Sequence, residues 1–134
     1  MSEPGEKIER GEGSGDVTTV VVVDDHAGFR AMARALLADG GFRVIGEATT
    51  GAQALALAAG LAPEVMLLDV QLPDIDGFAV SRALRSAGSE TRVVLCSVRA
   101  AADYGTRVGT CGATGFLTKS ELTAAALRAI LAES

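Results

Sequence analysis

The sequence predicts an α/β fold, a doubly wound five-stranded parallel sheet with helices on both faces, and three observations support it. Short apolar runs suited to buried strands recur at residues 17–23, 42–48, 65–69, 92–97 and 115–117. A segment with apolar residues at helical spacing follows each run. Five alternations of strand and helix favour a parallel sheet with right-handed crossovers.

Length and composition are typical of a single domain. The chain has 134 residues, 49% of them hydrophobic, which suffices for one buried core and is short for two domains. Residues 1–16 are rich in Gly, Glu and Ser, so we expect a disordered tail there and one domain over residues 17–134.

Charge and cysteine content argue against several classes of protein. A formal net charge of -5 disfavours direct binding to nucleic acid, which depends on Lys and Arg. No apolar run approaches the ~20 residues that span a bilayer, so no membrane association is expected. Cys96 lies in an apolar strand and Cys111 near a glycine-rich turn, so we expect neither a disulfide nor a metal site from them, and a cytoplasmic location.

Capping signals predict where several helices begin. Thr50 and Gln53 fit a capping box that opens the second helix. Ser120 is the expected N-cap of the last helix, which runs to about residue 132. The fourth helix, over residues 99–110, contains two glycines that each cost about 1 kcal/mol relative to Ala. We therefore expect this helix to be short, frayed or mobile.

Polar side chains occur where four of the predicted strands end. They are Asp24 and Asp25 after the first strand, Asp69 at the end of the third, Ser97 at the end of the fourth and Lys119 after the fifth. Because the carboxyl ends of parallel strands lie at one edge of a sheet, we expect these groups to meet there. Crowded carboxylates repel one another unless a cation joins them, and Mg²⁺ prefers such oxygen ligands. Mg²⁺ is therefore the expected cofactor.

This edge is suited to phosphoryl transfer. Asp69 is the expected nucleophile, forming an acyl phosphate, while Lys119 and Ser97 would contact the phosphoryl oxygens. Each residue also has a simpler interpretation. Asp69 could cap the next turn, one of the two adjacent acids after the first strand could cap a helix, and Lys119 could be an ordinary surface lysine. Their joint occurrence at strand ends favours the site.

With these residues in place, the chain resembles the receiver domain of a two-component response regulator. The resemblance covers about residues 18–132 and includes Pro73 and Asp76-Gly77 after the phosphoacceptor. The segments DDHAGFR, IGEATTGAQAL and GATGFLTKS are closest to the LuxR/NarL-type subfamily, whose members usually carry a C-terminal helix-turn-helix DNA-binding domain. The resemblance implies a flavodoxin-like (βα)5 fold with strand order 2-1-3-4-5. Since the sequence stops after the fifth helix, we expect a stand-alone receiver or an excised fragment.

The resemblance implies a role for each residue of the site. A sensor histidine kinase would donate a phosphoryl group to Asp69. Mg²⁺ would be held by Asp24 or Asp25, by Asp69 and by the backbone carbonyl of Gln71. Lys119 would hold the phosphoryl oxygens. The face made by the fourth helix, fifth strand and fifth helix is where partners and homodimers of the family form.

Counterparts of the family's switch and timing positions are also present. Ser97 is the switch hydroxyl and Phe116 the conformational aromatic, and their movements are coupled in the family. Gln71 and Arg99 occupy the positions at which the family tunes dephosphorylation. Val98 stands where the family often has a small residue, so we expect it to narrow access to the phosphoryl group.

Three other functions fit parts of the sequence. The main alternative is a pseudo-receiver, a protein-interaction module without phosphorylation, which Val98 and the glycine-rich fourth helix leave open. A phosphohydrolase with an Asp nucleophile is disfavoured because Asp69-Val70-Gln71 lacks a second acid. A flavodoxin-like cofactor binder is disfavoured because no glycine-rich phosphate loop follows the first strand. The sequence therefore favours a phosphoacceptor module that is not an enzyme.

Overall fold

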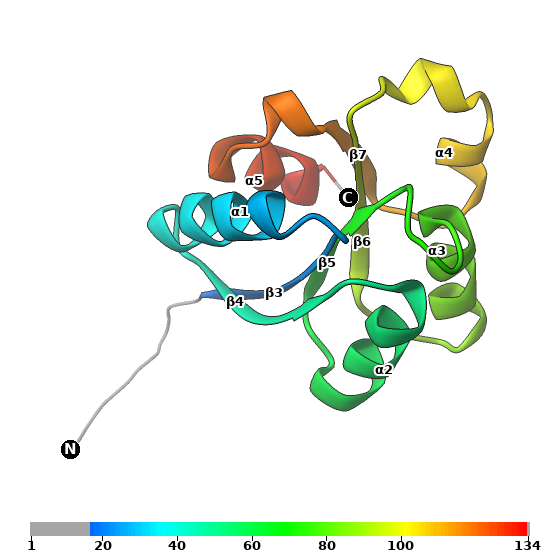
Figure 1. Ribbon diagram of the computed structural model, residues 1–134, viewed down its shortest axis with the longest axis horizontal. Helices are drawn as coiled ribbons and strands as arrows, with labels where there is room; N and C mark the ends of the chain where they lie inside the picture. The colour runs from blue at the N-terminus through cyan, green and yellow to red at the C-terminus, as the bar shows by residue number, and fades with distance from the viewer. Residues whose placement is uncertain (1–16, 134) are drawn as a thin grey trace.

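The computed structural model describes residues 17–133 as a parallel sheet with helices on both faces (Figure 1). Its strands are β3 (Thr18–Val23), β4 (Phe42–Ala48), β5 (Val65–Asp69), β6 (Arg92–Ser97) and β7 (Gly115–Thr118). They lie in the order β4-β3-β5-β6-β7, so the second strand along the chain is at one edge and the fifth at the other. The predicted fold and strand order are confirmed. The tail predicted at residues 1–16 lies outside the described residues.

The helices divide into two layers. Helices α1 (Ala27–Asp39) and α5 (Ala124–Ala132) cover one face of the sheet, and α2 (Gly51–Leu61) and α3 (Gly77–Ser86) cover the other (Figure 1). Within residues 17–133, no helix is both long and apolar enough to cross a membrane.

The central strand β5 is buried on both faces. Met66 and Leu68 belong to the core beneath α2 and α3, whereas Val65 and Leu67 belong to the core beneath α1 and α5. Side chains alternate between the two faces of a strand, and here each face meets a helical layer. A continuous apolar run therefore leads to Asp69, the residue that ends the strand.

The single helix predicted over residues 99–110 is wrong. The segment instead forms a 3-10 turn, η2 (Ala101–Tyr104), and one turn of helix, α4 (Arg107–Thr110). Gly105 separates them with φ +62, a left-handed conformation that ends a right-handed helix. The expectation that this helix would be short is confirmed.

Two of the predicted caps differ from those in the structure. Thr50 caps α2 by accepting a hydrogen bond from Gln53 N at 3.1 Å, but the Gln53 side chain accepts from Thr49 N rather than from Thr50 N. The predicted cap at Ser120 is wrong, because α5 begins after Thr123. Ser120 lies in a separate 3-10 turn, η3 (Lys119–Glu121). Leu122 then adopts an extended conformation and enters the core, which separates η3 from α5.

Candidate functional site

Two carboxylates meet at the carboxyl end of the sheet because their strands are neighbours. Val23 pairs with Leu68 in the register of β3 and β5, so the residues that follow, Asp24 and Asp69, lie side by side. The relative exposure of Asp24 is 0% and that of Asp69 is 4%. Single carboxylate oxygens of these residues and of the exposed Asp25, with a ring nitrogen of the adjacent histidine, all lie within 4.8 Å of one another.

Asp24 has different partners at its two oxygens. Its Oδ1 accepts a hydrogen bond from His26 N at 2.8 Å and lies 3.0 Å from His26 Nδ1. Its Oδ2 lies 2.5 Å from Lys119 Nζ, but no group in the described part of the chain donates a hydrogen bond of acceptable geometry to it. Burial alone would raise the pKa of Asp24, yet the contacts with Lys119 and His26 outweigh burial and hold this pKa below its ordinary value.

The negative charge of Asp69 is less well neutralised by its neighbours than that of Asp24. Its Oδ2 lies 3.4 Å from Lys119 Nζ, and its Oδ1 accepts from Gln71 N at 3.3 Å. Burial, together with the charge of Asp24, raises the pKa of Asp69 to about 6. The folded chain therefore holds more negative charge at this edge than Lys119 neutralises.

Lys119 is fixed between the two acids. It follows β7, its side chain is 14% exposed, and its Nζ lies 4.5 Å from the centroid of the Phe29 ring on α1. This cation–π contact orients the ammonium group and is not apparent from the sequence. Burial opposes the charge of Lys119, but its contacts with Asp24 and Asp69 prevail and raise its pKa. Lys119 is therefore a cation at neutral pH.

The loop after Asp69 is tied to the helices beside it. Gly77 N donates to Val70 O at 2.7 Å, and a Cβ at Gly77 would lie 2.6 Å from Asp69 O. Only glycine therefore allows α3 to begin so close to the strand end. Asp76 caps α3 through Ala79 N, and the Asp74 carboxylate accepts from two backbone N–H groups at the start of α2. These bonds restrain the loop that carries Gln71.

Ser97 lies one residue beyond the register partner of Asp69. The pairing of β5 with β6 places Asp69 opposite Cys96, and the buried Ser97 follows. Ser97 Oγ accepts from Arg99 N at 3.1 Å. It also lies 2.6 Å from the hydroxyl of Tyr104, a contact that the sequence analysis missed. The available signal was that the chain's single tyrosine lies close to Ser97 in sequence.

The remaining predicted residues lie around this edge with different exposure. The side chain of Val98 is 74% exposed, and Gln71 and Arg99 are also exposed. Phe116 on β7 is half-buried, with its ring centroid 6.0 Å from that of Tyr104. Burial raises the pKa of Cys96 to about 12, which keeps its thiol protonated beside the site.

The donor set fits a hard divalent cation. Asp24 Oδ2 is buried without a hydrogen bond among the described residues, and the raised pKa of Asp69 reflects burial first and then repulsion by Asp24. A cation bound between these oxygens would pair with Asp24 Oδ2 and relieve this repulsion. Oxygen ligands of this kind, partly exposed through Asp25, suit Mg²⁺, which takes one or two carboxylates and keeps several waters.

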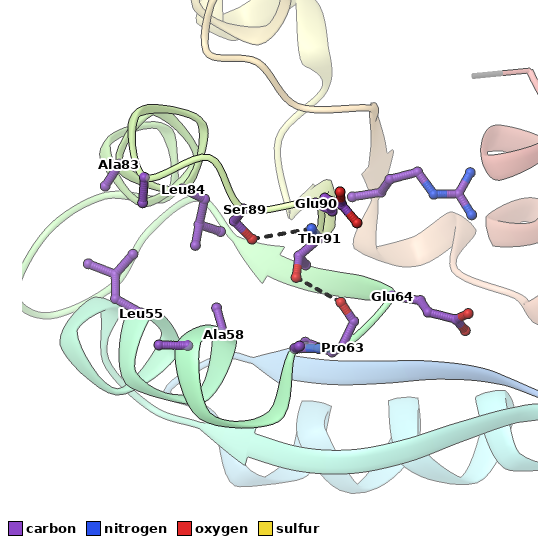
Figure 2. A pocket seen from close by; sticks show the side chains of 13 residues that line it. Leu55, Ala58, Pro63, Glu64, Ala83, Leu84, Ser89, Glu90 and Thr91 are labelled. Carbon is purple, nitrogen blue, oxygen red and sulfur yellow. Dashed lines mark hydrogen bonds between the residues drawn. The ribbon is translucent and has the colours of Figure 1, made fainter.

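A cleft of about 810 Å³ lies at the opposite edge of the sheet, between the last turns of α2 and α3 (Figure 2). Its lining includes Ala58, Pro63 and Leu84. Thr91 closes one side, where its Oγ1 donates to Pro63 O at 2.7 Å. The cleft lies beside the amino ends of β5 and β6, whereas the carboxylates lie at the carboxyl ends, so it is separate from the candidate site.

Comparison with known proteins shows the family of this chain. The family model described as the response regulator receiver domain matches residues 20–132. The chain therefore belongs to the response regulator receiver domains. Within that family its relatives include LuxR/NarL-type regulators.

Two curated relatives and one solved structure illustrate the similarity. NarL of Mycobacterium tuberculosis, named as a transcriptional regulatory protein, is 41% identical over 113 residues, which cover 84% of this chain and 52% of NarL. The response regulator GacA of Pseudomonas aeruginosa is 39% identical over 101 residues, covering 75% of this chain and 47% of GacA. The solved receiver domain of M. tuberculosis NarL has a TM-score of 0.79 at 39% identity, covering 88% of this chain and 96% of that one. The chain spans about half the length of the curated relatives it matches.

Proposed function

We propose that this domain is a Mg²⁺-dependent phosphoacceptor that receives a phosphoryl group from a sensor histidine kinase at Asp69. The observation that carries the proposal is the position of Lys119 Nζ, 2.5 Å from Asp24 Oδ2 and 3.4 Å from Asp69 Oδ2. A nucleophilic carboxylate, a second acid and a fixed cation are thus grouped at the carboxyl edge of a parallel sheet, where α/β proteins bind ligands.

The reaction is a phosphoryl transfer between two protein side chains. A carboxylate oxygen of Asp69 attacks phosphorus of the kinase's phosphohistidine, a P–O bond forms and the P–N bond breaks. The imidazole nitrogen keeps the bonding electron pair and takes up a proton. Lys119 stabilises the charge on the phosphoryl oxygens because it remains a cation at neutral pH, and Ser97 donates a hydrogen bond to them.

The metal would be held by residues of this chain. Asp24, Asp25 and Asp69 supply carboxylate oxygens, and Gln71 supplies its backbone carbonyl. A bound Mg²⁺ would offset the repulsion between these carboxylates and the incoming phosphoryl oxygens.

The output is a conformational change rather than a turnover product, so the domain acts as a signalling module and not as an enzyme. The change would reach the face formed by α4, β7 and α5, where a partner or a second copy would bind. Curated relatives are about twice as long and are named as regulators, which supports control of transcription through an output domain. The location we propose for this activity is the cytoplasm. The alternative is a pseudo-receiver that binds partners without phosphorylation.

Incubation with acetyl phosphate and Mg²⁺ tests the proposal. We expect the intact mass of the wild type to increase by one phosphoryl group and that of Asp69→Asn to stay unchanged, because the amide is not a nucleophile. Asp39→Asn is the matched control, since Asp39 is exposed at the last turn of α1, away from the candidate site, and its replacement should leave labelling intact. A wild type that neither acetyl phosphate nor its cognate kinase labels would contradict the proposal and favour the pseudo-receiver.

Val98→Ala is expected to accelerate labelling or phosphoryl loss. The Val98 side chain is exposed directly after Ser97, where it can limit the approach of water or a small phosphodonor. We expect an increase of about 2–5-fold, equivalent to ~0.4–1 kcal/mol of barrier. Rates come from intact-mass time courses, with the exposed Val17→Ala at the opposite edge as control. Equal rates for Val98→Ala and wild type would contradict an access role.

A further inference from the structure

The contact between Ser97 and Tyr104 joins the candidate site to a segment that the site does not otherwise use. The two hydroxyl oxygens lie 2.6 Å apart. Ser97 is buried at the end of β6, whereas Tyr104 is half-buried at the end of η2. The contact spans seven residues and connects the strand end beside Asp69 to the turn that precedes α4.

Surrounding aromatic and cationic groups hold the Tyr104 ring in place. Its centroid lies 5.3 Å from that of Phe78 in an edge-on arrangement and 6.0 Å from that of Phe116. The Arg107 guanidinium lies 4.6 Å from the Phe78 centroid and 5.8 Å from that of Tyr104. Because ring packing and cation–π contact both restrict the ring, its hydroxyl has a defined position.

The other hydrogen bond of Ser97 bears on which hydroxyl of the Ser97–Tyr104 pair is the donor. A serine hydroxyl can accept two hydrogen bonds and donate one. Arg99 N–H already occupies one acceptor position at 3.1 Å. Either hydroxyl of this pair could be the donor, but a phenolic hydroxyl is a stronger donor than an aliphatic one, which favours Tyr104 as donor to the second position. The proton of Ser97 is then left free to be donated elsewhere.

We propose that Tyr104 is a positioning residue, which donates to Ser97 Oγ and thereby directs the Ser97 hydroxyl proton toward a phosphoryl group on Asp69. This inference rests on the proposed phosphoacceptor function. Phe116, the aromatic residue whose movement the resemblance couples to that of Ser97, carries no hydroxyl. Its ring packs against the core beneath α2 and α3 and lies near the Tyr104 ring. The polar link from the site therefore runs through η2.

Placement in η2 extends the effect of this bond along the chain. Tyr104 is followed by Gly105, whose left-handed φ of +62 separates η2 from α4. If Ser97 changes its hydrogen-bond partner, the change therefore affects a short segment, which few helical hydrogen bonds hold in place. The Ser97–Tyr104 bond connects the chemistry at Asp69 with the position of η2.

The first test is spectroscopic and needs no phosphorylation. Tyr104 is the chain's single tyrosine and there is no tryptophan, so every tyrosine signal reports this side chain. The intensity ratio of the tyrosine Fermi doublet in the Raman spectrum distinguishes a donating phenol from an accepting one. In the wild type we expect the doublet ratio of a phenol that donates a strong hydrogen bond. In Ser97→Ala we expect this ratio to shift toward that of a phenol bonded to water. An unchanged doublet ratio in Ser97→Ala, or a wild-type ratio typical of an accepting phenol, would overturn the role of Tyr104. Neither result would contradict the proposed phosphoacceptor function.

The second test is kinetic. Tyr104→Phe keeps the ring and removes the hydroxyl, so it should slow labelling by acetyl phosphate about 3–10-fold while leaving the thermal midpoint near that of wild type. In a Ser97→Ala background the same change should have no further effect. Thr110→Val is the control, because Thr110 donates to Thr106 O in the same segment and does not contact Ser97.

The outcomes separate this inference from the proposed function. Equal slowing by Tyr104→Phe in both backgrounds, or none in the wild type, would overturn the positioning role while wild-type labelling still supports the phosphoacceptor. A wild type that is not labelled at all would overturn the proposed function, and with it the role of Tyr104 in directing a proton.

Discussion

Asp69→Asn makes the metal-free protein more stable at about pH 7.5, by an expected 1–3 kcal/mol (order of magnitude from the shift in pKa). The ionised Asp69 is buried beside Asp24, and both effects raise its pKa from 3.8 to about 6. Asparagine has a similar shape and no charge, so it removes the repulsion. Lys119 then pairs with the carboxylate of Asp24 alone, instead of with two carboxylates.

The sign of the pH dependence follows from the direction of the shift. Because the folded chain holds the proton of Asp69 more tightly than the unfolded chain does, ionisation lowers stability as pH rises through about 4 to 6. The difference between Asp69→Asn and wild type should therefore be small below about pH 4 and complete above about pH 6.

Urea unfolding with EDTA, measured between about pH 4 and pH 8, checks this expectation. Asp103→Asn is the control, since the same substitution at an exposed position should leave the free energy of unfolding nearly unchanged. If Asp69→Asn were less stable than wild type at every pH, the attraction of Lys119 for the two carboxylates would exceed the cost of their burial and mutual repulsion.

Lys119→Met has the opposite expected effect, a loss of about 2–4 kcal/mol in the metal-free protein near pH 8. Methionine keeps much of the packing of the stem but removes the charge beside Asp24, whose relative exposure is 0%. Asp24 Oδ2 would then have no cation within reach among the described residues. A buried charge without its partner costs far more than the loss of a surface ion pair.

Acid should relieve the loss in Lys119→Met. Without the cation, the pKa of each buried carboxyl is expected to rise, so protonation restores stability as pH falls toward about 5. Urea unfolding without metal gives the free energies, and Arg82→Met, at an exposed position on α3, is the matched control. A loss that is equal at every pH would attribute the effect to packing on Phe29 rather than to charge.

Together these two variants connect stability with function. Asp69, the proposed phosphoryl acceptor, lowers the stability of the metal-free fold when it is ionised, whereas Lys119, proposed to hold the phosphoryl oxygens, offsets part of this loss. Carboxylates gathered for a cation repel one another without it, so replacement of the nucleophile by Asn should increase stability while it removes phosphorylation.

Much of the fold could be predicted from the sequence because its signals are local. Continuous apolar runs predicted strands such as β5, and the cap residue Thr50 predicted where α2 begins. Ser120 failed as a cap because the choice between Ser120 and Thr123 depends on Leu122. Leu122 is drawn into the core beneath α1 and α5, and no local pattern shows which apolar residue a core will take.

The sequence by itself determined the strands, their polar ends and the residue types of the proposed phosphoacceptor site, since periodicity and strand-end positions are properties of short segments. Only the tertiary structure decided which groups touch. Register between β3 and β5 set Asp24 beside Asp69, and the Phe29 ring positioned Lys119 between them. Likewise, the break at Gly105 and the packing of Phe78 brought Tyr104 to Ser97. These contacts join residues from separate elements, so their distances follow from packing rather than from spacing along the chain.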